Sequence, residues 1–208
     1  MSANGSRTDT ERRGAMFMPA PPLSPAFHAK ARAIIARYPE ERERSALMSL
    51  LYLAQAEHGF VTGQAMGEIG ALLSISKAEV QAVATFYTMF KREQQGRWLV
   101  SVCTQPSCAL AGGGEILRRV CELAGVEPGG TSENGSVTVE EVECLCACDG
   151  APVFSVNYEN YERMQVDDAV GLVQDLHEGG APPAGARGEM PMDFTVVSER
   201  MAGPEARS

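Results

Sequence analysis

The sequence predicts an α+β fold, in which an N-terminal helical bundle is followed by an α/β domain. Apolar residues recur at helical spacing between residues 24 and 92, and from Trp98 onward the apolar segments become short or alternate with polar residues. Of the 208 residues, 44% are hydrophobic and 22% are charged, which is usual for a globular chain. The change of pattern near Trp98 predicts the boundary between the two parts.

Four helices are expected in the first part. The hydroxyl of Ser24, followed directly by a proline, is a helix-start signal, and Gly59 is typical of a helix end. Thr62 is expected to cap a third helix, and Ser76 with Glu79 forms a capping box for a fourth. The expected helices cover about 24–38, 41–58, 62–73 and 76–90.

The second part is expected to alternate strands and helices. A short apolar strand ends at Cys103, and an alternating strand ends at Cys144. The order strand, helix, strand, strand, helix is typical of an α/β sandwich. The expected elements are strands at 98–102, 137–143, 153–156 and 163–166, a helix at 114–124, and a last helix from Asp167 or Asp168 to Leu176.

Proline-rich and glycine-rich segments bound these parts. The polar start runs into Pro19, Pro21 and Pro22, and the run GGAPPAGARGEMP near the end has no apolar period. We therefore expect a flexible arm at 1–22, the helical bundle at 23–94, the α/β domain at 95–178, and a disordered tail at 179–208.

Charge is concentrated in the cysteine-bearing part of the chain. The formal net charge is −9, and residues 98–178 alone hold 3 Lys and Arg against 14 Asp and Glu, a balance of −11. This balance argues against binding to a nucleic-acid backbone and is compatible with docking onto a basic protein surface. No apolar run approaches the ~20 residues of a membrane span, so membrane contact is expected only through partners. The N-terminus lacks the apolar core of a secretory signal, which predicts a cytoplasmic location.

Four of the six cysteines form two closely spaced pairs. Four residues separate Cys103 from Cys108, three separate Cys144 from Cys148, and 35 lie between the pairs. Because each pair begins where a predicted strand ends, we expect all four sulfurs at one sheet edge, as an iron–sulfur cluster needs. Zinc also accepts four thiolates, and the spacing alone leaves it open. A disulfide framework would need an oxidising compartment, and no CxxC motif is present for thiol exchange.

Several segments also resemble a known family. They are RSALMSLLYLAQAEHGFVT at 44–62, KAEVQAVATFYTMF at 77–90, SVCTQPSCALAGGGEIL at 101–117 and VEEVECLCACDGAPVFSVNYENY at 139–161. In this order and spacing they resemble the thioredoxin-like 2Fe-2S subunit of bacterial NADH:quinone oxidoreductase, respiratory complex I. The resemblance covers residues 24–177 and implies a thioredoxin-like fold for residues 95–178.

The resemblance implies a function in electron transfer. It implies that Cys103, Cys108, Cys144 and Cys148 ligate one 2Fe-2S cluster, and that FMN and NADH are bound by a neighbouring flavoprotein subunit. The chain would then be an oxidoreductase subunit with no catalytic residues of its own. It would assemble with other peripheral-arm subunits on the inner face of the cell membrane. Related subunits serve NAD-linked hydrogenases and formate dehydrogenases. A zinc-stabilised adaptor and a free-standing thioredoxin-like ferredoxin are the other hypotheses.

One residue of the cysteine motif departs from the family pattern. Where the family usually has Cys-x-Gly-Ala-Cys, this chain has Cys146 in place of the glycine. Cys146 is either a bystander or an alternative ligand, and loss of the glycine predicts some backbone strain. Cys121, on the helix after the first pair, is expected to be a buried thiol. The Gly112–Gly114 run is expected to form a tight turn, since no phosphate-binding motif follows it.

Overall fold

The computed structural model describes residues 21–188 and 190–203, and it divides the chain into two compact units. Of the described residues, one unit comprises 21–94 with 195–203, and the other comprises 95–188 with 190–194. Most of the expected flexible arm, and the last five residues of the expected disordered tail, lie outside the described residues.

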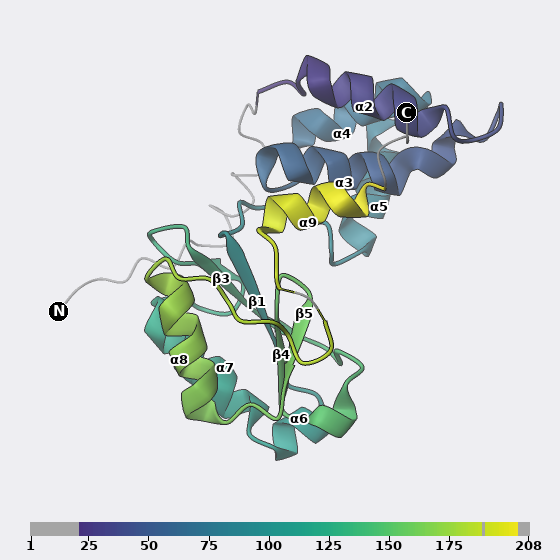
Figure 1. The fold of residues 1–208 in the computed structure, drawn as a ribbon. Helices are drawn as coiled ribbons and strands as arrows, with labels where there is room; N and C mark the ends of the chain where they lie inside the picture. Colours follow the sequence, from purple (N-terminus) through teal and green to yellow (C-terminus); the bar gives the residue numbers. More distant parts are fainter. Residues whose placement is uncertain (1–20, 189, 204–208) are drawn as a thin grey trace. The chain divides into compact units, whose positions relative to one another are not determined.

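The first unit is a bundle of helices (Figure 1). Its elements are α2 (Pro25–Ile35), a 3-10 turn (Glu43–Ala46), α3 (Leu47–His58), α4 (Gly63–Leu73), α5 (Lys77–Phe86) and, from residue 195 onward, α9 (Phe194–Met201). The core includes Leu50 and Leu51 of α3 with Met66 and Ile69 of α4, all fully buried. The helical spacing of these residues in the sequence therefore marks the buried faces of the helices.

The helix ends form at the positions that the capping signals predict. The Ser24 hydroxyl accepts the Phe27 N–H at 3.1 Å, and the Thr62 hydroxyl accepts the Ala65 N–H at 3.0 Å. The capping box at the start of α5 has both of its hydrogen bonds. Gly59 ends α3 with a φ of 77°, in the left-handed region where glycine lacks the steric penalty of a side chain.

The end of α5 differs from the sequence expectation. The apolar spacing predicts a helix that continues to Phe90, but the helix ends at Phe86 because Tyr87 takes an extended conformation. Phe86 is consequently 77% exposed, whereas Phe90 is 3% exposed and packs in the core. The helical spacing of Phe86, Tyr87 and Phe90 predicts core positions for all three, and this prediction is wrong for Phe86 and Tyr87.

The second unit contains a five-stranded mixed sheet in the order β2-β3-β1-β4-β5. The strands are β1 (Trp98–Cys103), β2 (Gly130–Thr131), β3 (Val137–Val142), β4 (Val153–Val156) and β5 (Glu159–Glu162). Strands β1 and β3 are parallel, and the other neighbouring pairs are antiparallel. Helices α7 (Gly113–Ala124) and α8 (Val166–His177) lie side by side and pack on the sheet (Figure 1). The predicted α+β fold is confirmed.

Two short elements of this unit and one strand position were not predicted. Helix α6 (Pro106–Leu110) and strand β2 are too short for a periodic signal. The hairpin turns at Asn157 and Tyr158, which both have positive φ, so β5 lies at Glu159–Glu162 instead of 163–166. A turn with two positive φ values matches the twist of the flanking strands. Helix α8 begins at Val166, slightly before the expected capping aspartates.

The expected disordered tail also differs from the structure in its described part. Within the second unit, three backbone groups of this segment are hydrogen-bonded to β5 or to the turn before it. Tyr161 donates to the Pro183 carbonyl at 2.6 Å, the Ala186 N–H donates to the Asn160 carbonyl at 2.7 Å, and the Asn157 amide donates to the Met192 carbonyl at 2.7 Å. Helix α9 then follows. This segment is ordered by hydrogen bonds to its backbone. Because such bonds do not require apolar side chains at regular spacing, the sequence shows no periodic pattern here.

Candidate metal centre

The candidate site lies at the sheet edge where β1 and β3 both end. Cys103 is the last residue of β1 and is in register with Val142, the last residue of β3. Because the two strands are parallel, their carboxyl ends meet at the same edge. Cys144 follows β3 by two residues. The sheet therefore brings the two cysteine pairs to one place.

The first cysteine pair is buried and held by regular structure. Cys103 is 2% exposed at the end of β1, and Cys108 is 3% exposed within α6. A Cβ on Gly113 would lie 2.5 Å from the Cys103 carbonyl oxygen and 2.9 Å from that of Cys108. Glycine at 113 therefore lets α7 begin directly against the backbone of both cysteines. With Gly112 at a φ of 99°, the glycine run forms the tight turn that the sequence predicts.

The second cysteine pair is exposed and lies on an irregular loop. The sulfurs of Cys144 and Cys148 are 3.3 Å apart, and the Cys146 N–H donates to the Cys144 sulfur, also at 3.3 Å. Cys146 has a φ of 58°, so the strained left-handed conformation expected at this position is present. Cys148 begins a single 3-10 turn that ends at Gly150. This loop thus aims a backbone N–H at a candidate ligand sulfur.

The first cysteine pair packs against the loop that carries the second pair. Cys103 and Cys108 pack with Ala147, from the second loop, and with Val153 at the start of β4. A hydrogen bond also joins the segments that carry the pairs, since the Thr104 hydroxyl donates to the Glu141 carboxylate at 2.6 Å. The described structure therefore places all four predicted ligands around one edge.

The cysteine thiols influence one another's pKa values. Burial raises the pKa of Cys108, and the neighbouring Cys103 and Cys148 raise it further against the effect of a hydrogen bond from the Val153 backbone. The Cys148 thiol and the Cys146 N–H hydrogen-bond to the Cys144 sulfur and lower its pKa. The pKa of Cys148 is raised in turn by Cys144. The mutual effects on these pKa values follow from the closeness of the sulfurs, and metal binding would deprotonate all four thiols.

The donor set fits a two-iron cluster. A 2Fe-2S cluster takes four thiolates and gains from backbone N–H groups that point at its sulfurs, and this edge supplies both. Among residues 21–188 and 190–203, no three His, Cys, Asp or Glu side chains converge on a single metal position, so the fit rests on the kind and number of donors at this edge and not on a coordination geometry that is already formed. None of the three histidines accompanies the cysteines, so thiolates are the donors that this edge offers.

An ionic group beside the second loop was not found from the sequence. The Arg187 guanidinium donates to both carboxylate oxygens of Asp149, at 3.0 and 3.1 Å, and also to the carboxylate of Glu162. It thereby holds the pKa of Asp149 below its usual value. Asp149 directly follows Cys148, but Arg187 lies in a segment with no apolar pattern, so no sequence signal connects the two residues.

The remaining two cysteines lie in different environments. The Cys146 side chain is exposed, with its sulfur 3.7 Å from the Cys144 carbonyl oxygen. Cys121 is buried in the core between the sheet and α7, where burial raises its pKa to about 11. Cys121 is thus placed as the ordinary buried thiol that the sequence predicts.

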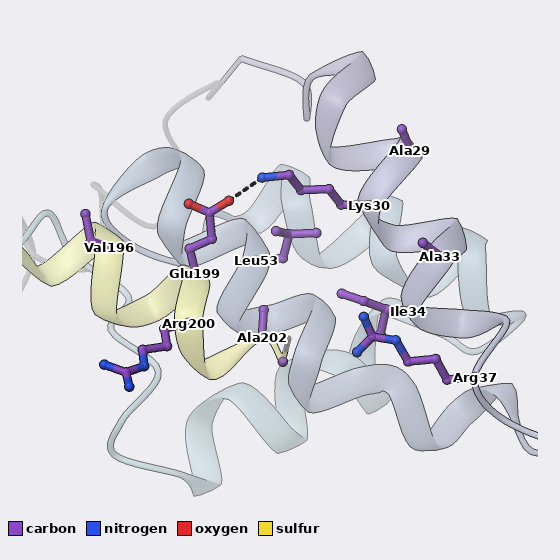
Figure 2. A pocket seen from close by; sticks show the side chains of 11 residues that line it. Ala29, Lys30, Ala33, Ile34, Arg37, Leu53, Val196, Glu199, Arg200 and Ala202 are labelled. Carbon is purple, nitrogen blue, oxygen red and sulfur yellow. Dashed lines mark hydrogen bonds and ion pairs between the residues drawn. The ribbon is translucent and has the colours of Figure 1, made fainter. Parts of the chain in front are cut away.

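A cavity of about 560 Å³ lies within the helical unit, and no cysteine lines it. Figure 2 shows apolar side chains such as Ala33, Ile34 and Leu53 around it, with the ion pair between Lys30 and Glu199 at its side. The described helices include none that is long and apolar enough to cross a membrane.

A small α/β domain with two cysteine pairs at one sheet edge defines a class of thiolate-ligated metal proteins. Comparison with protein families makes the assignment specific, since residues 31–177 match the family model described as thioredoxin-like [2Fe-2S] ferredoxin. The chain belongs to this family, which confirms the thioredoxin-like 2Fe-2S resemblance of its motifs.

The chain is similar to several components of NADH-oxidising complexes. It is 39% identical over 188 residues to an NADH-quinone oxidoreductase subunit of Mycobacterium tuberculosis, covering 90% of this chain and 73% of the relative. It is 33% identical over 184 residues to the mitochondrial NADH dehydrogenase [ubiquinone] flavoprotein 2 of Dictyostelium discoideum, covering 86% and 74%. Among solved structures, an air-oxidised NAD+-reducing [NiFe]-hydrogenase matches with a TM-score of 0.57 at 20% identity. That match covers 64% of this chain and 23% of the hydrogenase chain, and it supports the fold alone.

Proposed function

We propose that this chain is the electron-transfer subunit of the NADH-oxidising module of an NADH:quinone oxidoreductase. In this proposal Cys103, Cys108, Cys144 and Cys148 ligate one 2Fe-2S cluster. The observation that carries the proposal is the meeting of the two cysteine pairs where the parallel strands β1 and β3 end, in a chain of the thioredoxin-like [2Fe-2S] ferredoxin family.

A bound 2Fe-2S cluster supplies one-electron transfer. The residues of the chain hold, orient and shield it. Cys103 and Cys108 offer ligands that are fixed before the metal arrives, because β1, α6 and Gly113 restrict them. Ala147 and Val153 pack against this pair and limit the access of water, while the Cys146 N–H is directed at the Cys144 sulfur.

The proposed electron partner is a flavoprotein subunit that binds FMN and NADH. The surface beside the first cysteine pair suits close approach, because residues 104–114 carry no charged side chain and Leu110 is 92% exposed. The acidic side chains of Glu141, Glu143 and Asp149 lie on the second segment and are exposed. An apolar contact surface rimmed by basic groups would complement this face. Assembly with such peripheral-arm subunits would place the chain on the inner face of the cell membrane.

Two other hypotheses are separated by experiment. The equivalent subunit of an NAD-linked hydrogenase or formate dehydrogenase would carry the same cluster, and the identity of 39% to the mycobacterial NADH-quinone oxidoreductase component favours the respiratory complex. A zinc-stabilised adaptor would use the same thiolates for a structural purpose. It would have neither visible absorption nor a redox signal.

The test is to purify the full chain anaerobically and measure iron, zinc, visible absorption and the electron paramagnetic resonance of the dithionite-reduced form. We expect two irons per chain and one paramagnetic centre, both lost in Cys144→Ser. One zinc per chain without iron would refute the cluster. Co-purification of the native complex, with its neighbouring subunits identified by mass spectrometry, then decides the host.

A further inference from the structure

The segment that follows the family-matched region runs against the sheet edge beside the candidate cluster loop. The family model ends at residue 177, whereas residues 183–188, here named the C-terminal strap, lie along β5. Pro183 and Ala186 are hydrogen-bonded to the residues of that strand, as described above. The strap belongs to the same compact unit as the four cysteines.

Two glycines allow the strap to lie close to β5. A Cβ on Gly185 would be 3.0 Å from the Asn160 carbonyl oxygen, and a Cβ on Gly188 would collide with the Glu159 carboxylate. Glycine at these positions therefore brings the strap within side-chain reach of the cluster loop. Arg187 lies between these two glycines in the sequence, and its side chain contacts the cluster loop at Asp149.

Arg187 joins two carboxylates that lie on separate segments of the second unit. It contacts Asp149, the residue after Cys148, and Glu162, the last residue of β5. The Glu162 side chain is only 10% exposed in this pair, and it packs so closely on Gly150 that a Cβ there would collide with it. The Arg163 N–H also donates to the Gly150 carbonyl at 2.6 Å. These contacts fix the backbone that leaves Cys148.

We propose that Arg187 is a positioning residue for the cluster, which it serves by holding the Cys148 loop against β5 and by adding a positive charge beside it. This inference rests on the proposed function. The charge matters because residues 98–178 carry a net charge of −11, and reduction of a cluster adds one more negative charge. A cation that offsets part of the negative charge of Asp149 and Glu162 therefore makes reduction easier and raises the midpoint potential.

The test uses the full chain loaded with its cluster and three variants at the strap. Arg187→Gln removes both the charge and the planar set of guanidinium N–H donors, whereas Arg187→Lys keeps the charge and loses that set of donors. Tyr161→Phe removes the hydrogen bond to the Pro183 carbonyl of the strap without changing the charge. Arg119→Gln is the matched control, because it removes one positive charge from the same unit through a pair that is 3.9 Å apart and exposed. The readouts are the midpoint potential by paramagnetic titration and the rate of iron loss to a ferrous chelator.

We expect Arg187→Gln to have a more negative midpoint potential than Arg119→Gln and to lose iron several-fold faster. Arg187→Lys should keep the potential but lose iron faster, and Tyr161→Phe should do the same. If Arg187→Gln does not fold by circular dichroism, Arg187→Lys and Tyr161→Phe still test the positioning role, because both variants keep the positive charge.

Equal potentials and equal iron loss in Arg187→Gln and Arg119→Gln would overturn the inference and leave the proposed function intact. In Arg187→Lys and Tyr161→Phe, iron loss at the wild-type rate would likewise overturn it. A wild-type chain that binds no iron would instead refute the proposed function itself.

Discussion

The two cysteine pairs of this domain are held in place by different means. Cys103 and Cys108 are buried, one at the end of a central strand and the other in a helix that Gly113 allows to pack tightly. Cys144 and Cys148 are exposed on a loop with one left-handed residue, and Arg187 holds the residue that follows them. The difference teaches that one half of the site is made rigid by the fold, whereas the other half depends on local polar contacts and on the metal itself.

A single cysteine replacement in either pair should abolish cluster binding, but the two replacements should differ in their effect on the free energy of unfolding. Cys108→Ser and Cys144→Ser should both bind no cluster, because four thiolates are needed. In the metal-free chain, Cys108→Ser places a hydroxyl in an apolar cluster and should lower the free energy of unfolding by about 1–3 kcal/mol. Cys144→Ser is exposed and should stay within about 0.5 kcal/mol of the wild type. Iron content and urea unfolding measure both effects, and equal destabilisation would contradict the comparison.

Adding a single methyl group should disturb the rigid half. Gly113→Ala puts a Cβ against the carbonyls of Cys103 and Cys108, and overpacking of this kind costs about 1–3 kcal/mol. Gly114→Ala is the matched control, since a Cβ there meets nothing within 4 Å. The control should be neutral or more stable by about 0.4–1 kcal/mol. Urea unfolding and iron per chain are the measurements, and similar behaviour of the two variants would show that Gly113 does not hold the first pair.

Thiol labelling of the metal-free chain should sharpen the contrast between the pairs. The lowered pKa of Cys144 increases its thiolate fraction at a given pH, whereas burial raises the pKa of Cys108 and decreases it. Because the thiolate is the nucleophile, iodoacetamide near pH 8 should label Cys144 well before Cys108. Fragment mass spectrometry reads the order, with the buried Cys121 as the slow reference. Labelling of Cys108 at the rate of Cys144 would argue against a buried, pre-formed pair.

The smallest effect is expected at Cys146. Cys146→Gly should keep the full cluster and raise the free energy of unfolding by about 1 kcal/mol or less, because glycine takes the left-handed conformation without the penalty of a side chain. Cys146→Val, which is branched at Cβ, should have the opposite effect on stability. Iron per chain and urea unfolding check both variants. Loss of iron in Cys146→Gly would instead identify this thiol as a ligand.

Local signals in the sequence were sufficient for the parts that regular structure determines. Capping residues such as Ser24, Thr62 and Ser76 predict helix starts because their hydrogen bonds span only three residues. The apolar strand that ends at Cys103 and the alternating strand before Cys144 likewise place both cysteine pairs at strand ends. Cysteine spacing alone did not distinguish an iron–sulfur cluster from zinc. The family resemblance predicted the 2Fe-2S cluster and the host complex.

The parts that the sequence did not predict depend on contacts between distant residues. Arg187 reaches Asp149 across 38 residues, and no periodic pattern reports such a bond. The hairpin strand was placed too late because its turn uses Asn157 and Tyr158 in the left-handed region, where no glycine marks it. The exposure of Phe86 follows from a single extended residue, Tyr87, which apolar spacing does not reveal.

The parallel pairing of β1 with β3 also governs which lengths of this chain are free to change. The register of Cys103 with Val142 sets the distance in space between the two cysteine pairs. The number of residues between the pairs, 35 in this chain, does not set that distance. The exposed turn at 133–135 can lengthen or shorten in evolution while the sulfurs stay in place. In searches for similar sites, the two short cysteine intervals should therefore be held constant and the long interval left open.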